Sequence, residues 1–322
     1  MSGTLVEIQG LNKQYVLSGG FFNPQKRIIH AVNDMDLQIF QGETLGVVGE
    51  SGCGKSTLAR LITRLEKPSS GSINFKGENI FSFDKEALKF YRRSVQIIFQ
   101  DSYSSLNPRK SALSMIKEPL TIHRLGGKKE RNEKALDVMA KVGLKKEHAD
   151  RYPHEFSGGQ RQRIGIARAL VLSPELVIAD EPVSSLDVSI QAQILNLLRD
   201  LKKDYKLTYL FISHDLNVIR YISDRVAVMY LGKIVELALN NDIYRRPLHP
   251  YTRMLLSAVP VCDPCKKEKI IKIRGEARAE NEKGCLFQNR CSYKIDICER
   301  IEPRLEKFDE QSFCACHRAG SI

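Results

Sequence analysis

The strongest constraint on the fold of this chain is a glycine-rich motif that directly follows a short apolar run. Residues 44–48 read TLGVV, which is typical of a buried strand, and residues 49–56 read GESGCGKS. The second stretch matches the phosphate-binding loop GxxxxGKS, which lies between a strand and a helix. In such a loop backbone N–H groups surround the phosphates, the lysine reaches the β- and γ-phosphates, and the final hydroxyl binds Mg²⁺. The motif therefore predicts a nucleotide site on an α/β fold.

Other apolar segments support this fold class. Residues 176–179 (LVIA) and 209–212 (YLFI) are typical of buried strands. Residues 5–11 and 28–49 also favour strands. Apolar side chains recur at helical spacing within residues 190–201, between the two buried strands. Strands that alternate with helices indicate a largely parallel sheet that is covered on both faces.

Two further motifs have residue types that suit ATP hydrolysis: a pair of adjacent acids and a pair of adjacent glycines. Asp180 and Glu181 end the strand predicted at residues 176–179, where one carboxylate can bind Mg²⁺ and the other can polarise a water that attacks the γ-phosphate. A strand end that simply meets solvent would also account for two acids. Residues 156–160 read FSGGQ and precede a helical segment, and small residues at a helix start leave its N-terminus open to an anion.

Taken together, these motifs resemble the ATP-binding subunits of ABC transporters. FSGGQ is similar to the signature motif of that family, and Asp180-Glu181 to its Walker B pair. Four more elements follow the family's order along the chain: Tyr15 as the aromatic residue that stacks on adenine, Gln100 in the Q-loop, residues 184–187 (SSLD) as the D-loop and His214 as the switch histidine. In this family two ATPase domains pack head to tail, and each ATP lies between the phosphate loop of one and the signature helix of the other.

The resemblance implies roles for individual residues. Glu181 would be the general base, His214 would position the water and sense the γ-phosphate, and Gln100 would take part in catalysis. Ser56, Gln100 and Asp180 would bind Mg²⁺. The implied nucleotide-binding set is Tyr15, Gly49, Glu50, Ser51, Gly52, Cys53, Gly54, Lys55, Ser56, Thr57, Asp180 and Asp187, together with the signature residues Ser157, Gly158, Gly159 and Gln160. The signature residues would contact the nucleotide that the opposite chain holds.

The same resemblance implies an architecture. We expect an α/β fold with a P-loop NTPase core of the RecA-like kind, an antiparallel β-subdomain and a helical signature subdomain, plus a small cysteine-rich C-terminal region. The ATPase domain would span residues 1–249, with the helical subdomain at about residues 101–158, and the C-terminal region would span residues 250–322. A proline-rich stretch at residues 246–250 (RPLHP) marks the boundary.

Finer similarities point to the oligopeptide and dipeptide importer branch of the family. They are residues 100–109 (QDSYSSLNPR), residues 245–260 (RRPLHPYTRMLLSAVP) and the cysteine-bearing tail, while the insertion at residues 15–32 resembles the F-type subunit of that branch. This implies an ATP-hydrolysing subunit that powers import of dipeptides, oligopeptides or related solutes. Its partners would be a second ABC ATPase (a D-type paralogue, or a second copy in isolation), two transmembrane permease subunits and, indirectly, an extracytoplasmic solute-binding protein. It would lie peripherally on the cytoplasmic face of the plasma membrane.

Cysteines are concentrated at the C-terminal end, since seven of the eight lie within residues 262–322. In a reducing compartment such a group favours a metal over disulfides. Four of them match the cysteines that the importer branch associates with a four-iron four-sulfur cluster: Cys285, Cys291, Cys298 and Cys316. Four thiolates suit such a cluster or Zn²⁺, and a tail without any metal is the third alternative. Cys262 and Cys265 have a zinc-like spacing, and these two and Cys314 could also stay unliganded. Cys53 lies at a helix N-terminus, where a thiol can become reactive.

Net charge leaves one alternative function. Lys and Arg number 50 against 38 for Asp and Glu, which gives +12 and would suit nucleic acid, a membrane surface or a phosphate-rich ligand. The alternative is a soluble ABC-type regulatory or nucleic-acid-associated ATPase with a metal-binding tail. The basic residues are dispersed and no nucleic-acid-reading motif occurs, so we expect no nucleic acid partner. With no apolar run of about 18 residues and no leader at the start, we expect a cytosolic chain.

Overall fold

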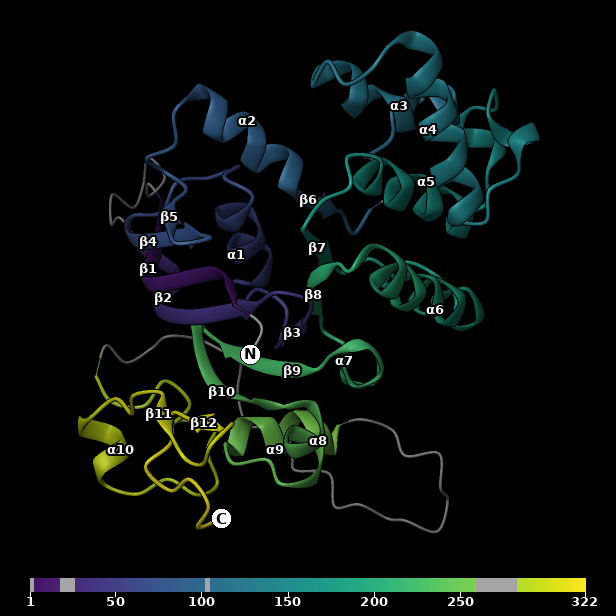
Figure 1. Ribbon diagram of the computed structural model, residues 1–322. Coiled ribbons are helices and arrows are strands. Elements are labelled where there is room, and N and C mark those ends of the chain that lie inside the picture. The colour runs from purple at the N-terminus through teal and green to yellow at the C-terminus, as the bar shows by residue number, and fades with distance from the viewer. Residues whose placement is uncertain (1–2, 18–26, 102–104, 259–282) are drawn as a thin grey trace, which may run out of the picture. The chain divides into compact units, whose positions relative to one another are not determined.

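The computed structural model describes residues 3–17, 27–101, 105–258 and 283–322 (Figure 1). The chain forms two compact units, each described by itself. The first comprises Met1–Leu5, Phe40–Glu43 and Glu78–Phe211, and the second comprises Val6–Ile39, Thr44–Gly77 and Ile212–Ile322. Four features of the sequence lie outside the described residues: positions 18–26 of the insertion, positions 102–104, Cys262 and Cys265.

The strands of the first unit are short, and β7 (Leu176–Asp180) and β8 (Thr208–Ser213) are the most buried of those described. β6 (Val95–Ile98) and β7 pair in parallel, with Val95 opposite Leu176. β8 neighbours β7 in the sheet, is buried along its whole length, and runs on into the second unit. β5 (Glu78–Asn79) is a two-residue strand. The apolar runs that predicted buried strands at β7 and β8 are therefore confirmed.

The described helices of the first unit are α2 (Lys85–Ser94), α3 (Ala112–Ile122), α4 (Lys128–Lys141), α5 (Gly158–Leu170) and α6 (Val188–Tyr205), with single turns at Lys146–His148 and Pro153–Glu155. α3 packs against both α4 and α5 (Figure 1). α6 buries Ile194, Leu198 and Leu201 on one face, at the spacing that a one-sided helix requires. The helix predicted between the two buried strands is therefore confirmed.

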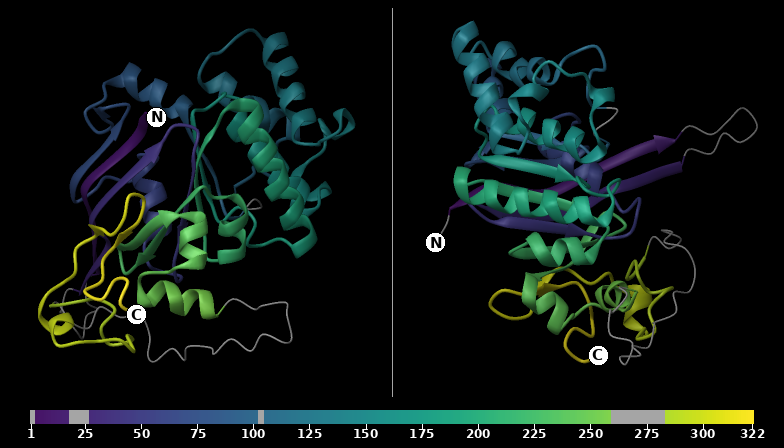
Figure 2. Two further views of the ribbon diagram at one scale, coloured as in Figure 1. Left: turned by 60° about the horizontal axis from the view of Figure 1, so that its bottom comes forward. Right: turned by 90° about the vertical axis from the view of Figure 1, so that its right-hand side faces the viewer.

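The second unit contains two groups of strands. The long strands β1 (Thr4–Leu17) and β2 (Arg27–Phe40) lie side by side (Figure 2, right). β4 (Ser70–Phe75) pairs antiparallel with β1, with Val6 opposite Phe75. The other group has the order β11 (Glu306–Lys307), β12 (Phe313–Cys314), β10 (Lys233–Leu239), β9 (Arg225–Tyr230) and β3 (Thr44–Val48). Only β3 and β9 pair in parallel within that order, so the sheet is mixed.

The antiparallel pairing of β9 with β10 follows from one tight turn. Leu231 and Gly232 join β9 to β10, and both have positive φ angles, 43° and 85°, as a two-residue hairpin requires. So short a connection cannot cross the sheet, and the two strands must run antiparallel. The prediction of a largely parallel sheet is therefore wrong here, because the sequence pattern showed strands without showing how they connect.

The helices of the second unit are α1 (Lys55–Ile62), α7 (Leu216–Ile222), α8 (Asn240–Arg245), α9 (Pro250–Ser257) and α10 (Ile297–Arg300). The C-terminal residues 283–322 extend the sheet at β10 by adding β12 and β11, and the Ala315 N–H donates to the Val235 carbonyl (2.8 Å). None of the helices in the described part of the chain has the length and apolarity needed to cross a bilayer.

Candidate nucleotide site

The phosphate loop lies between β3 and α1, where the sequence predicts it. Lys55 is buried, and its Nζ donates to the carbonyl oxygens of Gly49 (2.7 Å) and Glu50 (2.9 Å). These acceptors matter because an unpaired charge is costly to bury. The ammonium group is therefore held against the backbone that would surround a bound phosphate.

Two glycines let the phosphate loop approach neighbouring backbone. Gly54 is the N-cap of α1 with φ 108°, and a Cβ there would collide with the carbonyl oxygen of Ala31 in β2. A Cβ at Gly49 would collide with the carbonyl oxygen of Met229 in β9. The loop is therefore packed directly on two strands, and its shape depends on the absence of side chains at these positions.

Replacing Gly54 with alanine is expected to weaken ATP binding by at least about tenfold and to destabilise the protein by more than about 1 kcal/mol, because the new Cβ meets backbone and the positive φ is strained. Gly42→Ala is the matched control, since Gly42 has φ 80° and no heavy atom within 4 Å of a Cβ. It should show only the strain and keep its ATP affinity. ATP titration would measure the affinity, and thermal unfolding would measure the stability. Equal losses of ATP affinity in Gly54→Ala and Gly42→Ala would contradict the prediction.

Cys53 is buried inside the phosphate loop. Its Sγ lies 3.8 Å from Lys55 Nζ, and burial raises the pKa of the thiol against a weaker opposing effect of the lysine charge. A thiol with a raised pKa stays protonated at neutral pH and is a poor nucleophile. Burial of Cys53 thus weighs against the reactive thiol that the sequence suggests there.

Two candidate catalytic residues meet at the carboxyl ends of β6 and β7. Gln100 Nε2 donates to Glu181 Oε2 at 3.2 Å. Glu181 directly follows Asp180, the last residue of β7, and has a left-handed φ of 47°. Because adjacent parallel strands end at the same edge of a sheet, the fold itself brings these side chains together.

The signature residues open helix α5. Ser157 is the N-cap: its Oγ accepts from the Gln160 N–H (3.3 Å), and Gln160 Oε1 accepts from the Ser157 N–H (3.1 Å). A Cβ at Gly159 would lie 2.5 Å from Ile190 Cγ2, so α5 approaches the start of α6 closely. The N–H groups of the first helical residues have no acceptor within a helix. This N-terminus can therefore bind an anion.

Asp187 begins helix α6. Its Oδ1 accepts from the Ile190 N–H (2.9 Å) and from the Ser189 hydroxyl (2.7 Å), and these hydrogen bonds lower the pKa of the carboxyl. Sequence reasoning assigned Asp187 to the nucleotide and missed this role. The signal was available, because an aspartate just before a run of helical spacing is a typical N-cap.

Tyr15 lies in β1 within a charged network. Its hydroxyl donates to Glu66 (2.5 Å), and Glu66 also pairs with Lys13 (3.3 Å) and Arg60 (3.5 Å). Lys13 Nζ lies 5.0 Å from the centroid of the Tyr15 ring. The lysine occupies one face of the ring, so a base could stack only on the other face. Sequence reasoning missed Glu66, which is 51 residues from Tyr15 and carries no local signal.

The candidate residues are divided between the two units. His214 follows β8 in the second unit, is exposed, and precedes Asp215, whose side chain accepts from the Asn217 N–H (2.7 Å) at the start of α7. Tyr15 and the phosphate loop also belong to the second unit. The first unit carries the remaining residues: Gln100, Ser157, Gly158, Gly159, Gln160, Asp180, Glu181 and Asp187.

Three cysteines of the C-terminal region share one backbone pattern. The N–H two residues further on donates to the sulfur: Tyr293 to Cys291 (3.4 Å), Arg318 to Cys316 (3.4 Å) and Phe287 to Cys285. Burial raises the pKa of Cys285 to about 12, and neighbouring thiols add to this effect. Within the described ranges, no three or more His, Cys, Asp or Glu side chains are arranged to hold a metal ion.

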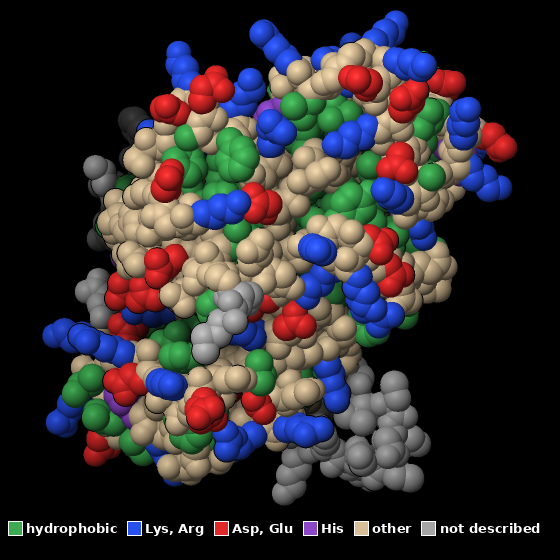
Figure 3. All heavy atoms as spheres, viewed as in Figure 1, with side chains coloured by type: hydrophobic (Ala, Val, Ile, Leu, Met, Phe, Trp, Pro, Cys, Tyr) green, Lys and Arg blue, Asp and Glu red, His purple; other side chains and the backbone are tan. Residues whose placement is uncertain are grey.

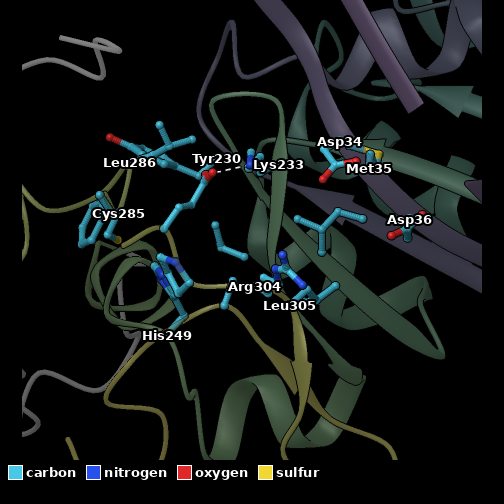
Figure 4. Close-up of a pocket in the computed structure, with 16 residues that line it drawn as sticks. Asp34, Met35, Asp36, Tyr230, Lys233, His249, Cys285, Leu286, Arg304 and Leu305 are labelled. Carbon is cyan, nitrogen blue, oxygen red and sulfur yellow. Dashed lines mark ion pairs between the residues drawn. The ribbon is translucent and has the colours of Figure 1, made fainter. Parts of the chain in front are cut away.

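A cavity of about 680 Å³ lies in the second unit beside the C-terminal region (Figure 4). Its walls include Asp34 and Asp36 of β2, Arg304, and Lys233 of β10, which pairs with Glu302 at 2.7 Å. No residue of the phosphate loop lines it. The candidate nucleotide site is therefore separate from this cavity.

Two families match successive parts of the chain. The model for the ABC transporter matches residues 32–184, and the model for the oligopeptide/dipeptide transporter C-terminal region matches residues 235–298. The chain is 51% identical to the oligopeptide transport ATP-binding protein AppF of Bacillus subtilis (strain 168), over 98% of this chain and 97% of that protein. The chain belongs to the ABC transporter family. This ABC ATPase is also 48% identical to the dipeptide transport ATP-binding protein DppF of Escherichia coli (strain K12), over 95% of this chain and 92% of that protein.

A solved structure supports the same assignment. The ABC ATPase resembles the ATP-binding cassette MJ0796, in a dimeric post-hydrolysis state bound to ADP and Pi, with a TM-score of 0.64 and 30% identity over 73% of this chain and 98% of that chain. The fold is therefore the ABC ATPase cassette, an α/β fold with mixed sheets, and the chain is an ATPase. The prediction of the family and of this enzyme class is confirmed.

The face of the ABC ATPase that is drawn in Figure 3 gives little support to the nucleic-acid alternative. On the face drawn in Figure 3, Lys and Arg side chains are scattered among acidic and apolar ones and do not gather in one stripe. Binding to a nucleic acid backbone favours basic side chains clustered on one face. On that face the basic side chains are thus dispersed, as they are along the sequence.

Proposed function

We propose that this ABC ATPase hydrolyses ATP to power the import of dipeptides, oligopeptides or related solutes. The observation that carries the proposal is its likeness, over nearly the whole chain, to ATP-binding proteins named for oligopeptide and dipeptide transport. The likeness extends to the C-terminal region, where the matching family is itself described by those transporters. The phosphate loop and the residues at the end of β7 supply the chemistry.

The nucleotide would be held by the phosphate loop at residues 49–56. Lys55 would exchange its carbonyl acceptors for the β- and γ-phosphates, and the loop N–H groups would surround them. Tyr15 would stack on adenine through the ring face that Lys13 leaves open. Ser56, Gln100 and Asp180 offer the oxygen donors that Mg²⁺ prefers, and the ion would neutralise charge on the transferred phosphoryl group.

Hydrolysis would need the end of β7 and an opposite chain. Glu181 would take the proton from the attacking water, and its hydrogen bond to Gln100 would orient the carboxylate. His214 would position the water. The N-terminus of α5 at Ser157 would complete the site of a second ABC ATPase, either a D-type paralogue or another copy of this chain.

The assembly would place this subunit against a membrane. Two transmembrane permease subunits would bind it, an extracytoplasmic solute-binding protein would act indirectly, and the chain would lie peripherally on the cytoplasmic face of the plasma membrane. Residues 1–249 would be the ATPase domain, with a helical subdomain at about residues 101–158. Residues after Gln100 and around Arg109 would face the permeases. Residues 250–322 would form the C-terminal region.

The C-terminal region would bind a four-iron four-sulfur cluster, with a single Zn²⁺ as the alternative. The proposed ligands are Cys285, Cys291, Cys298 and Cys316. Support comes from the backbone N–H groups that point at three of these sulfurs. Such a group would cross-link the described residues 283–322, in which α10, β11 and β12 are four, two and two residues long.

Uptake of a labelled dipeptide by cells that lack this chain tests the proposed function. The wild-type chain should restore uptake, and Lys55→Ala should not, because a loop without its lysine cannot hold the phosphates. Lys129→Ala is the matched control, since its side chain on α4 is 92% exposed, and it should restore uptake fully. ATP hydrolysis without any peptide uptake, together with salt-sensitive binding to duplex DNA, would favour the alternative function.

A further inference from the structure

The C-terminal region contacts the phosphate loop through a forked ion pair. Arg290 Nη1 donates to Glu50 Oε2 (2.8 Å), and Nη2 donates to Glu50 Oε1 (2.7 Å). Glu50 is the second residue of the phosphate loop, and Arg290 directly precedes Cys291. Both residues belong to the second unit. The ion pair therefore joins segments that are 240 residues apart in the chain.

Arg290 is held in place from several sides. Its side chain is only 6% exposed, and that of Glu50 is 27% exposed. The guanidinium carbon lies 5.8 Å from the ring centroid of Tyr230 and 5.9 Å from that of Phe287. An arginine side chain is always protonated in proteins, so the guanidinium carries its positive charge. Removing one partner of such a pair leaves the other charge without compensation.

Glu50 is also fixed through its backbone. Its N–H donates to the hydroxyl of Tyr251 in α9 (2.9 Å), and its carbonyl accepts from Lys55 Nζ (2.9 Å) and from the Cys53 N–H (3.3 Å). The side chain that Arg290 binds and the carbonyl that Lys55 binds therefore belong to one residue. A change in the Arg290 ion pair would reach the phosphate-binding lysine through a single amino acid.

We propose that Arg290 is a positioning residue of the phosphate loop, which anchors and neutralises Glu50 so that the loop accepts the phosphates of a nucleotide. A carboxylate inside a loop that binds a polyanion opposes binding unless its charge is compensated. Arg290 supplies that compensation from the C-terminal region, and the affinity for nucleotide thereby depends on how this region is folded. The inference rests on the proposed nucleotide site at residues 49–56.

Two matched variants separate the charge of Arg290 from its packing. Arg290→Met keeps a long side chain against Tyr230 and Phe287 but has no charge. Arg290→Lys keeps the charge but cannot make the two parallel hydrogen bonds to Glu50. In the full-length protein, we expect Arg290→Met to raise the Kd for ATP by about tenfold, with kcat within about twofold of wild type. Arg290→Lys should recover most of the affinity. Displacement of a fluorescent ATP analogue measures Kd, and phosphate release measures kcat.

Removing the carboxylate provides an independent check. Glu50→Gln in the Arg290→Met background should return the Kd for ATP close to the wild-type value, because no uncompensated charge remains in the loop. Lys55→Ala should abolish ATP binding in every background, and failure of this control would count against the proposed nucleotide site. If Lys55→Ala behaves as expected while Arg290→Met leaves the Kd unchanged, the role of Arg290 is refuted. The role of Arg290 would also be refuted if Arg290→Met and Arg290→Lys lost ATP affinity equally, had a lower Tm, and were not rescued by Glu50→Gln. Arg290 would then be a structural anchor only.

Discussion

Replacing Glu181 with glutamine is expected to lower kcat for ATP hydrolysis by about 10³-fold and to leave the affinity for ATP within about threefold of wild type. Glutamine has nearly the same shape as glutamate, so the backbone at the end of β7 and the contact with Gln100 should persist. What is lost is the carboxylate that accepts the proton of the attacking water. An interaction made only in the transition state lowers kcat without changing ground-state binding.

Phosphate release under single-turnover conditions and titration with a fluorescent ATP analogue measure the two quantities. Glu133→Gln is the matched control, because this carboxylate on α4 is 64% exposed and lies outside the candidate site. It should change neither value. Near-normal turnover in Glu181→Gln would remove Glu181 from the role of general base, whereas a parallel loss of ATP binding would mean that the carboxylate acts in holding the nucleotide.

The parts that could be predicted from the sequence depend on short-range patterns. The phosphate loop could be placed because TLGVV before it reads as a strand and the lysine-serine pair after it begins a helix. α6 could be predicted because apolar residues recur every three to four positions, and Ile194, Leu198 and Leu201 are indeed buried. Each of these signals lies within about 20 residues, the range over which periodicity is informative.

The parts that could not be predicted depend on pairings between distant segments. The order of strands in the mixed sheet depends on the hairpin at Leu231 and Gly232, and the strands β11 and β12 have two residues each, too few to show any alternation. The Tyr15 network and the Arg290 ion pair join residues 51 and 240 positions apart. Without an alignment a single sequence holds no signal for such contacts, although each partner is visible as a charged or aromatic residue.

Replacing Cys291 with serine is expected to remove most of the iron and acid-labile sulfide from protein purified without oxygen, together with its broad visible absorbance. Cys291 is one of the four proposed ligands, and its sulfur accepts the Tyr293 N–H. Cluster sulfurs commonly accept backbone hydrogen bonds, and losing one of four thiolates removes a cluster ligand that serine replaces poorly. Iron, sulfide and zinc content, measured per chain, give the result directly.

Cys314→Ser is the matched control for this measurement. Cys314 lies two residues before Cys316 and is equally part of the cysteine-bearing tail, but it is buried in β12 against β10, and burial raises the pKa of its thiol. Iron should therefore be retained in Cys314→Ser. Zinc without sulfide in the wild-type protein would replace the cluster by a single-ion site, and equal iron loss in both variants would place Cys314 among the ligands.

The Cys291→Ser variant also tests whether the cysteines affect nucleotide binding. Arg290 directly precedes Cys291, and the turn that carries both is held by hydrogen bonds from the Arg290 N–H to the Phe287 carbonyl (3.0 Å) and from the Gln288 N–H to the Cys285 carbonyl (3.0 Å). If Cys291→Ser releases this turn, Glu50 loses its partner, and the Kd for ATP should rise about as much as in Arg290→Met. Cys314→Ser should leave the Kd unchanged. Iron loss with unchanged ATP affinity would mean that the ion pair survives without the metal, so the turn would be stabilised by the packing of Phe287 against Tyr230 and Tyr251.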